Sequence, residues 1–229
     1  MSSIGTHMME DWYKIPEIRF GDYVESLKGV YDARTANIDV QTDERDAFTK
    51  AVIPFRLEDE LWRQRDKKIS MALGDFHQKL MGKFPGYTDL GVGHETGLDL
   101  MKNDETEYWE VKNRHNTMNS SSAETALKKL LIVKEGGAKV FLAEINCPGG
   151  RVNRYGWPTD VTVLNGEQAY THLAGGRVTF WNDLIYTISE TFRRFSTYSE
   201  IQQFAAQLPL PISQEQHSQS VCIEQPYLL

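Results

Sequence analysis

The sequence predicts an α/β fold, in which a mixed central sheet is flanked by helices. Apolar residues recur every three to four positions between about residues 56 and 83, which is typical of an amphipathic helix. Three short strand-like segments follow, and after them come a second helical segment and an apolar strand over 139–145. A strand, a helix and a strand in this order indicate a crossover connection onto the same sheet. The predicted order is therefore helix, three strands, helix, strand.

Length and composition limit the class of protein. The chain has 229 residues, which suits one compact domain or at most two small ones, and 40% of them are hydrophobic, enough for a buried core. A net charge of −7 excludes a wholly cationic coat for nucleic acid or anionic membranes. Two cysteines are too few for a disulfide scaffold, and no apolar run reaches the ~20 residues of a membrane helix, so we expect a cytoplasmic protein with no membrane partner. Residues 1–8 are interpreted as the remnant of an expression tag, which leaves a single domain over residues 9–229.

The first predicted helix carries one apolar stripe and ends at Gly82 and Pro85-Gly86. Strands are predicted over 87–92, 97–103 and 107–113, with a polar turn at 103–106. The stripe, which we expect to be buried, consists of Leu57, Leu61, Ile69, Leu73, Phe76 and Leu80.

The hairpin formed by the last two of these strands contains the most informative residues. A turn centred between Asp104 and Glu105 places Asp99 directly opposite Glu110. Because side chains alternate along a strand, Lys112 lies on the same face as these two acids, with Gly97 opposite it. The other face is apolar and is formed by Leu98, Leu100, Trp109 and Val111.

Two carboxylates in facing positions would have β-carbons only ~5 Å apart and would repel each other. A divalent cation bound by Asp99 and Glu110, with the backbone carbonyl of Val111 as a further ligand, would offset this repulsion. Lys112 could then orient or deprotonate a water molecule, or stabilise charge on a phosphate. The alternative is an ordinary surface pair in which Lys112 bridges Glu110, since short motifs often occur by chance.

A second helix is predicted from a capping box formed by Ser121 and Glu124, and it ends at Gly136-Gly137. A loop over 146–160 follows the next strand, with Trp157 tucked beneath it. A further helix is expected over about 178–195, and the last 20 or so residues are expected to be extended.

The residues around the hairpin also resemble a known family. Gly-His-Glu-Thr-Gly-Leu-Asp (93–99) is followed by Glu-Val-Lys-Asn-Arg-His-Asn-Thr-Met-Asn-Ser-Ser-Ser (110–122). Together with the order of elements, these residues resemble the PD-(D/E)xK nuclease superfamily. The second run is similar to one group of type II restriction endonucleases, in which Lys-Asn-x-His-Asn-Thr-Met-Asn-Ser-Ser follows the catalytic acid. The resemblance covers about residues 56–146.

The resemblance implies a restriction-endonuclease-like core (αβββαβ) over about 56–146, with DNA-recognition and dimerisation elements around it. It also implies that Asp99 and Glu110 bind Mg²⁺ and that Lys112 is catalytic. Leu98 departs from the pattern, because the superfamily often has proline there. Such enzymes often carry another acid on the first helix, and either Glu60 or Asp75 fits that position.

A DNA-facing surface is predicted from charge. Residues 112–154 contain eight Lys or Arg and three Glu, a charge of +5 in a chain of −7, and this asymmetry suits a cleft that receives phosphates. Lys128 and Lys129 are expected only to solvate an exposed helix face. His115 either contacts a phosphate or caps its loop. The predicted phosphate-contacting residues are Asn113, Arg114, His115, Asn116, Asn119, Ser120 and Ser121, and the predicted base-reading residues are Arg151, Asn153 and Arg154.

These observations predict a Mg²⁺-dependent, sequence-specific endonuclease for double-stranded DNA, that is, a type II restriction enzyme that acts as a homodimer on a short palindrome. The resemblance suggests a GC-rich site such as GGNCC, and a cognate DNA methyltransferase in the same system. One alternative is a structure-specific or repair nuclease on the same core, which would nick junctions instead of giving discrete fragments. Another is a non-catalytic DNA-binding module, which would bind DNA without Mg²⁺-dependent cutting.

Overall fold

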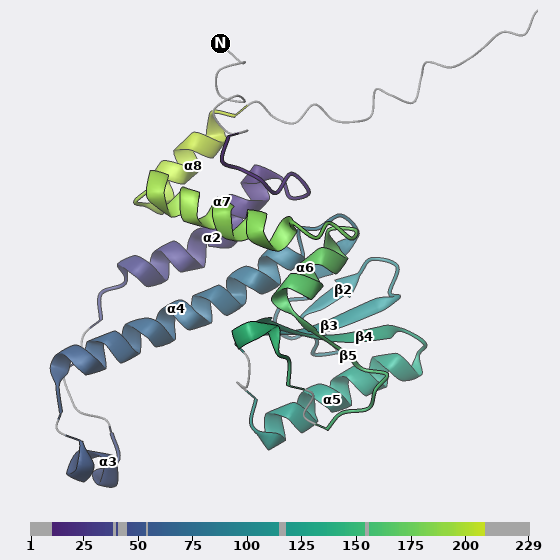
Figure 1. Ribbon diagram of the computed structural model, residues 1–229, viewed down its shortest axis with the longest axis horizontal. Helices are drawn as coiled ribbons and strands as arrows, with labels where there is room; N and C mark the ends of the chain where they lie inside the picture. Colours follow the sequence, from purple (N-terminus) through teal and green to yellow (C-terminus); the bar gives the residue numbers. More distant parts are fainter. Residues whose placement is uncertain are drawn as a thin grey trace, which may run out of the picture.

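A five-stranded sheet forms the centre of the computed structural model, which describes residues 11–38, 40, 45–53, 55–114, 118–153 and 156–208. The spatial order is β1-β2-β3-β4-β5, and Figure 1 shows the helices around it. The first three strands pair antiparallel, whereas β3–β4 and β4–β5 pair parallel, so the sheet is mixed as predicted. The strands are β1 (Tyr87–Asp89), β2 (Leu100–Lys102), β3 (Glu107–Arg114), β4 (Lys139–Asn146) and β5 (Thr162–Asn165).

The predicted order of elements is confirmed. Helix α4 (Leu57–Met81) precedes the three antiparallel strands, and α5 (Ser120–Glu135) connects β3 to β4. A parallel pair needs such a crossover, because the chain must return to the end of the sheet at which β3 began before it can form β4 in the same direction. The structure therefore contains the predicted helix, three strands, helix and strand, with β5 added beside β4.

Helices cover both faces of the sheet (Figure 1). One face packs against α4 and α6 (Gly166–Leu173), while α2 (Phe20–Thr35) packs on α4 and α7 (Phe180–Arg194) packs on α6 in the same core. In that core Trp109 of β3 stacks on Phe141 of β4 with ring centroids 4.2 Å apart. The other face packs against α5, where Ala126 and Leu130 contact a second core that includes Leu142 of β4. Strand β4 is thus buried on both sides, as its apolar run predicted.

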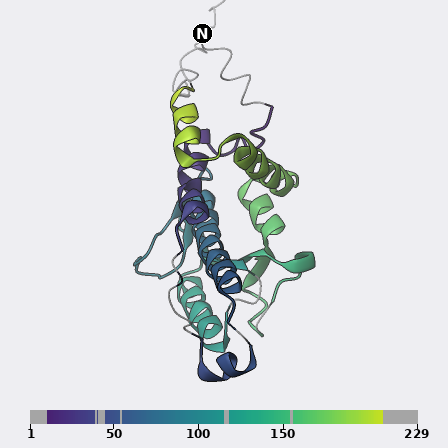
Figure 2. The same ribbon diagram turned by 90° about the vertical axis from the view of Figure 1, so that its left-hand side faces the viewer.

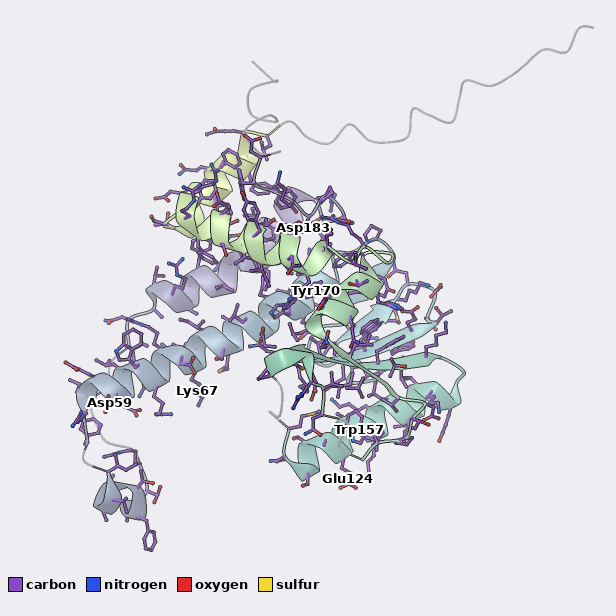
Figure 3. The ribbon with its side chains drawn as sticks, viewed as in Figure 1. Asp59, Lys67, Glu124, Trp157, Tyr170 and Asp183 are labelled. Carbon is purple, nitrogen blue, oxygen red and sulfur yellow. The ribbon has the colours of Figure 1, made fainter. Side chains whose placement is uncertain are left out.

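The first half of α4 does not carry the predicted buried stripe. Phe76 and Leu80 are buried, but Leu57 is 49% exposed. Figures 1 and 2 show why: this half of α4 extends beyond the sheet, with α3 (Ala47–Val52) at its far end. Asp59 and Lys67 mark this half of the helix in Figure 3. An apolar period of 3.6 residues predicts a helix correctly, but it does not say whether another element covers the stripe.

The predicted register of the hairpin is confirmed, because Leu100 pairs with Trp109 and Met101 pairs with Tyr108. The turn residue Glu105 has a φ of 59°. The predicted apolar face is wrong at Leu98, which packs into the core beside α5, whereas Leu100, Trp109 and Val111 pack on the opposite side of the sheet. The cause is that β2 begins only at Leu100, so strict alternation does not extend to residue 98.

Helix α5 begins differently from the prediction. Its N-cap is Asn119, whose side chain accepts a hydrogen bond from the Ser122 backbone N–H, so the proposed Ser121 capping box is wrong. The helix is followed by Gly137 at φ 94°, as the glycine pair predicted. Helix α7 confirms the helix expected over 178–195, and Trp157 is buried.

Helices α2 and α3 and the short 3-10 helix over Pro148–Gly150 were not predicted, and three later elements were also missed. These three are β5, α6 and α8 (Tyr198–Ala206). The expected tag over residues 1–8, Cys222 and the expected extended C-terminal segment lie outside the described residues. Within the described residues, no helix is both long and apolar enough to cross a membrane.

Candidate active site

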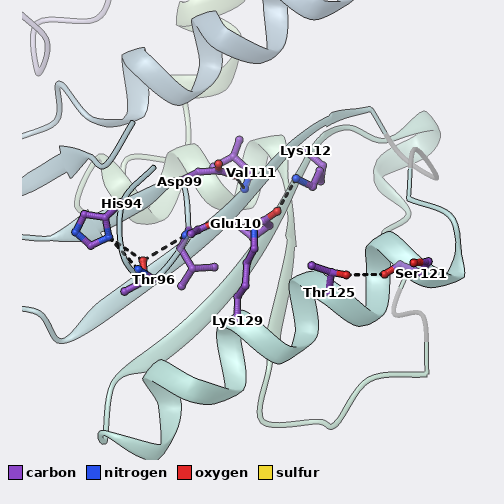
Figure 4. Close-up of polar contacts among 11 residues, drawn as sticks. His94, Thr96, Asp99, Glu110, Val111, Lys112, Ser121, Thr125 and Lys129 are labelled. Carbon is purple, nitrogen blue, oxygen red and sulfur yellow. Dashed lines mark hydrogen bonds and ion pairs between the residues drawn. The ribbon is translucent and has the colours of Figure 1, made fainter. Parts of the chain in front are cut away.

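The two predicted acids meet where β2 and β3 lie side by side (Figure 4). Asp99 lies one residue before β2, and its backbone N–H donates to the Trp109 carbonyl over 3.0 Å. Its carboxylate oxygen Oδ2 accepts a hydrogen bond of 2.7 Å from the backbone N–H of Val111. Glu110 is on β3 and is only 4% exposed. Backbone pairing thus fixes Asp99 beside Glu110.

Burial and repulsion raise the pKa of Asp99 to about 6, well above the usual range of a carboxyl group. Removal from water is the larger cause, and the negative charge of Glu110 is the second. The hydrogen bond from Val111 and the charges of Lys112 and Lys129 act in the opposite direction but do not outweigh them. A carboxyl group perturbed by burial and by a second acid is typical of functional sites.

Lys112 points to the same side, as predicted, and its Nζ lies 2.6 Å from Glu110 Oε1. This is not the surface pair of the alternative interpretation, because the Glu110 side chain is 5% exposed and the Lys112 side chain 29%. The second oxygen, Glu110 Oε2, is buried and has no hydrogen-bond partner among the described residues. An unsatisfied buried carboxylate oxygen is costly, so this atom is the one best placed to receive a ligand.

The donor set fits a hard divalent cation, because Asp99 and Glu110 present carboxylate oxygens side by side and one of those oxygens has no hydrogen-bond partner among the described residues. The helix acids do not join them here. Glu60 accepts from Arg63 and Gln64 within α4, and Asp75 is exposed. In the described ranges, no group of three or more His, Cys, Asp or Glu side chains is close enough to hold a metal ion. The candidate metal ligands are therefore Asp99, Glu110 and the backbone carbonyl of Val111.

The predicted DNA-contacting residues fall into two places. Asn113 lies at the end of β3 and donates through Nδ2 to the Ser70 carbonyl of α4 over 2.8 Å, while its Oδ1 accepts from Asn146. It lines a pocket of about 500 Å³ along α4 that also includes Arg63 and Lys67. This pocket includes Asp66 as well, so the middle of α4 borders the end of β3.

A second pocket, of about 620 Å³, brings together Asn119, Ser120 and Asn153 from segments far apart in the sequence, with Trp157 in its wall. Ser121 and Arg151 are exposed, and they lie next to Ser120 and close to Asn153 in the sequence. His115, Asn116, Arg154 and the side chain of Arg114 lie outside the described residues, so their predicted contacts with DNA stay predictions.

Sequence reasoning missed two residues. Lys129, expected to be solvated, turns toward the acid pair from α5, and its Nζ lies 4.0 Å from Glu110 Oε2. The side chain of its neighbour Lys128 is 70% exposed, as expected, and it pairs with Glu124. Glu144 is fully buried on β4 and accepts the backbone N–H of Asn153 over 2.6 Å, which anchors the predicted base-reading loop. Glu144 could have been noticed because it is a charged residue within an apolar strand. Lys129 could have been noticed because it lies on the same side of the predicted helix as Ala126 and Leu130.

These features together define an α/β protein with a buried two-acid site and a neighbouring lysine, located on β3 and immediately before β2. A family model described as Eco47II restriction endonuclease matches residues 25–149, which is more than half of the chain. The chain therefore belongs to the Eco47II restriction endonuclease family. The match includes α4, both acids, Lys112 and α5, and it ends before Arg151 and Asn153.

Two curated relatives agree with this family. The type II restriction enzyme Sau96I of Staphylococcus aureus is 30% identical over 125 residues, which cover 53% of this chain and 47% of that enzyme. The type II restriction enzyme Eco47II of Escherichia coli is 39% identical over 59 residues, which cover 26% of this chain and 24% of that enzyme. The similarity thus spans about half of the first relative and about a quarter of the second. The predicted resemblance to type II restriction endonucleases is confirmed.

Proposed function

We propose that this protein is a Mg²⁺-dependent type II restriction endonuclease that hydrolyses double-stranded DNA at a short palindromic site, on a restriction-endonuclease-like core. The observation that carries the proposal is the buried pair Asp99 and Glu110 with Lys112 beside it, in a chain of the Eco47II restriction endonuclease family. The repulsion between these two buried carboxylates lowers the stability of the fold. A chain that retains such a pair is therefore expected to use it for function.

In this mechanism Asp99 and Glu110 hold the metal ion, with the Val111 carbonyl as a third protein ligand. The bound ion supplies Lewis-acid stabilisation of the negative charge that develops on the scissile phosphate. The Val111 N–H orients the Asp99 carboxylate, since it donates to Oδ2 over 2.7 Å. Lys112 Nζ, now 2.6 Å from Glu110 Oε1, positions the attacking water or stabilises the phosphate from the same side.

DNA binding is assigned to the residues beyond the catalytic strand. Asn119 and Ser120 at the start of α5 present polar groups and backbone N–H donors to a phosphate, and Asn153 faces the same pocket. Arg151, Asn153 and Arg154 are assigned to base reading. A palindromic site has two-fold symmetry, so we propose a homodimer, with a cognate methyltransferase as a separate protein of the same system.

The proposal is tested by replacing one acid of the buried pair and, separately, the lysine beside it. Glu110→Ala and Lys112→Ala should each abolish cleavage of phage DNA in Mg²⁺, while DNA binding in a gel-shift assay survives because other phosphate contacts supply most of the affinity. The matched controls are Lys28→Ala and Asp32→Ala, which break an exposed Lys–Asp pair of 2.6 Å on α2 and should cleave normally. Cleavage at the unmodified rate by Glu110→Ala or by Lys112→Ala would refute the proposed role of the replaced residue.

A further inference from the structure

Lys129 connects three parts of the site that are separate in the sequence. It projects from α5, and its Nζ donates a hydrogen bond of 2.7 Å to the Gly97 carbonyl, two residues before Asp99. The same Nζ lies 4.0 Å from Glu110 Oε2 on β3 (Figure 4). Its side chain is only 34% exposed, although lysine usually extends into solvent.

The backbone at Gly97 is shaped to receive this side chain. Gly97 has a φ of 63°, a left-handed conformation that favours glycine. A β-carbon at this position would come within 3.2 Å of Lys129 Cε, so a side chain there would press against the lysine stem. The lysine packs where Gly97 leaves room. The sequence analysis had placed Gly97 opposite Lys112 instead.

The segment that leads into Asp99 needs such an attachment. Residues 90–99 contain no strand, and Gly91, Gly93 and Gly97 all have positive φ. The backbone of Asp99 is held on the sheet side, where it donates to Trp109 and accepts from Leu90. Lys129 holds the same segment from the α5 side, so Asp99 is fixed between a strand and a helix.

Charge gives Lys129 a second role. Glu110 lies between two lysines: Lys112 Nζ is 2.6 Å from Oε1, and Lys129 Nζ is 4.0 Å from Oε2. Because Oε2 has no hydrogen-bond partner among the described residues, Lys129 is the cation that faces the oxygen available for a ligand. It offsets the repulsion between the two carboxylates without occupying that oxygen at hydrogen-bond distance.

We propose that Lys129 is a positioning residue of the metal site, which holds the Asp99 segment through the Gly97 carbonyl and balances the charge of Glu110. This inference rests on the proposed nuclease function. Loss of the attachment should slow cleavage, because a ligand that is less well fixed is less well aligned. Loss of the ammonium group should not weaken metal binding, because a positive charge beside Glu110 opposes the approach of a cation. Slower cleavage with undiminished metal affinity is therefore the expected signature.

The test compares Lys129→Met, Lys129→Arg and the neighbouring control Lys128→Met as full-length proteins. Cleavage is measured on an oligonucleotide duplex that contains the site mapped for the unmodified protein, and Ca²⁺ binding is measured by calorimetry without DNA. We expect Lys129→Met to lose ~10-fold to 100-fold in kcat, the range typical of residues that orient metal ligands. Its KM for DNA should stay within about twofold and its Ca²⁺ affinity should be equal or higher, because the metal ligands themselves are retained. Lys129→Arg should recover most of the rate, and Lys128→Met should match the unmodified protein.

Two results would overturn the inference. One is cleavage by Lys129→Met at the rate of Lys128→Met, which would make Lys129 an ordinary surface lysine. The other is a parallel loss of cleavage and Ca²⁺ affinity with no rescue by arginine, which would mean that Lys129 only supports the fold. If the unmodified protein neither cleaves DNA nor binds Ca²⁺, the proposed function itself fails, so the two failures are distinguishable.

Discussion

Asp99→Asn should stabilise the metal-free protein, although it removes a residue of the proposed active site. The pKa of Asp99 is about 6 in the fold and about 3.8 in the unfolded chain, so the folded state binds more protons between these values. Stability therefore decreases as pH rises from about 4 to about 6, and the full cost applies above pH 6. Two pKa units correspond to ~3 kcal/mol, which we reduce to ~2 kcal/mol because Asp99 is partly exposed.

Asparagine keeps an oxygen that can accept the Val111 N–H and removes the repulsion by Glu110. At pH 7.5 in EDTA, ~2 kcal/mol should raise the melting temperature by ~4–8 °C for a domain of this size. The difference should be small near pH 4 and vanish below about pH 3, where Asp99 is protonated in both states. Ca²⁺ should stabilise the unmodified protein but not the variant.

The control for this prediction is Asp104→Asn, on the turn of the same hairpin. Hydrogen bonds from Thr106 lower the pKa of Asp104, so its charge is favourable in the fold and its removal should give no stabilisation. Scanning calorimetry or thermal denaturation followed by circular dichroism measures all of these differences. An Asp99→Asn protein that melts at or below the temperature of the unmodified protein in EDTA at pH 7.5 would contradict the prediction.

Three further predictions concern other residues. Burial lowers the pKa of His77 to about 3, so its contribution to folding stability is intact above pH 6.5 and is lost as pH falls. His77→Gln can still pair with Tyr170 and should remove ~2 kcal/mol of the destabilisation seen in denaturant titrations at pH 5. An unchanged pH dependence of stability in this variant would count against the prediction. Asn119→Ala removes the cap of α5 and should cost ~1 kcal/mol in the same titrations, whereas Asn119→Ser should cost less. Glu144→Leu leaves the Asn153 N–H without this acceptor and should raise the KM for DNA, whereas Glu144→Gln should not; equal KM values for the two variants would show that the anchor has no role in binding.

The register of the β2–β3 hairpin could be predicted because one polar turn and the period of a strand are enough to pair Leu100 with Trp109, which brings Asp99 beside Glu110. The order of the main elements was predictable for the same reason, since each has a period and a clear end. The exposure of the first half of α4 was not predictable, because its apolar residues recur with the same period as those of a buried helix. Whether they are covered depends on how far the sheet extends beneath the helix.

Residues whose role depends on contacts between distant segments could not be found from spacing. Lys128 and Lys129 are adjacent and chemically identical, yet one pairs with Glu124 in solvent and the other reaches Gly97. The elements β5 and α6 had a usable signal, because Asn165 and Gln168 form a capping box. Leu98 shows the limit of alternation, since one left-handed glycine before it ends the strand pattern.

The most direct measurement is digestion of long, unmethylated phage DNA by the purified protein, with Mg²⁺ in one reaction and EDTA in the other. The account predicts discrete fragments with Mg²⁺ alone, and sequencing of their ends should reveal one short palindrome. Intact DNA with Mg²⁺, Mn²⁺ and Ca²⁺ alike, or cutting that continues in EDTA, would contradict the claim that Asp99 and Glu110 form the metal site of a sequence-specific nuclease.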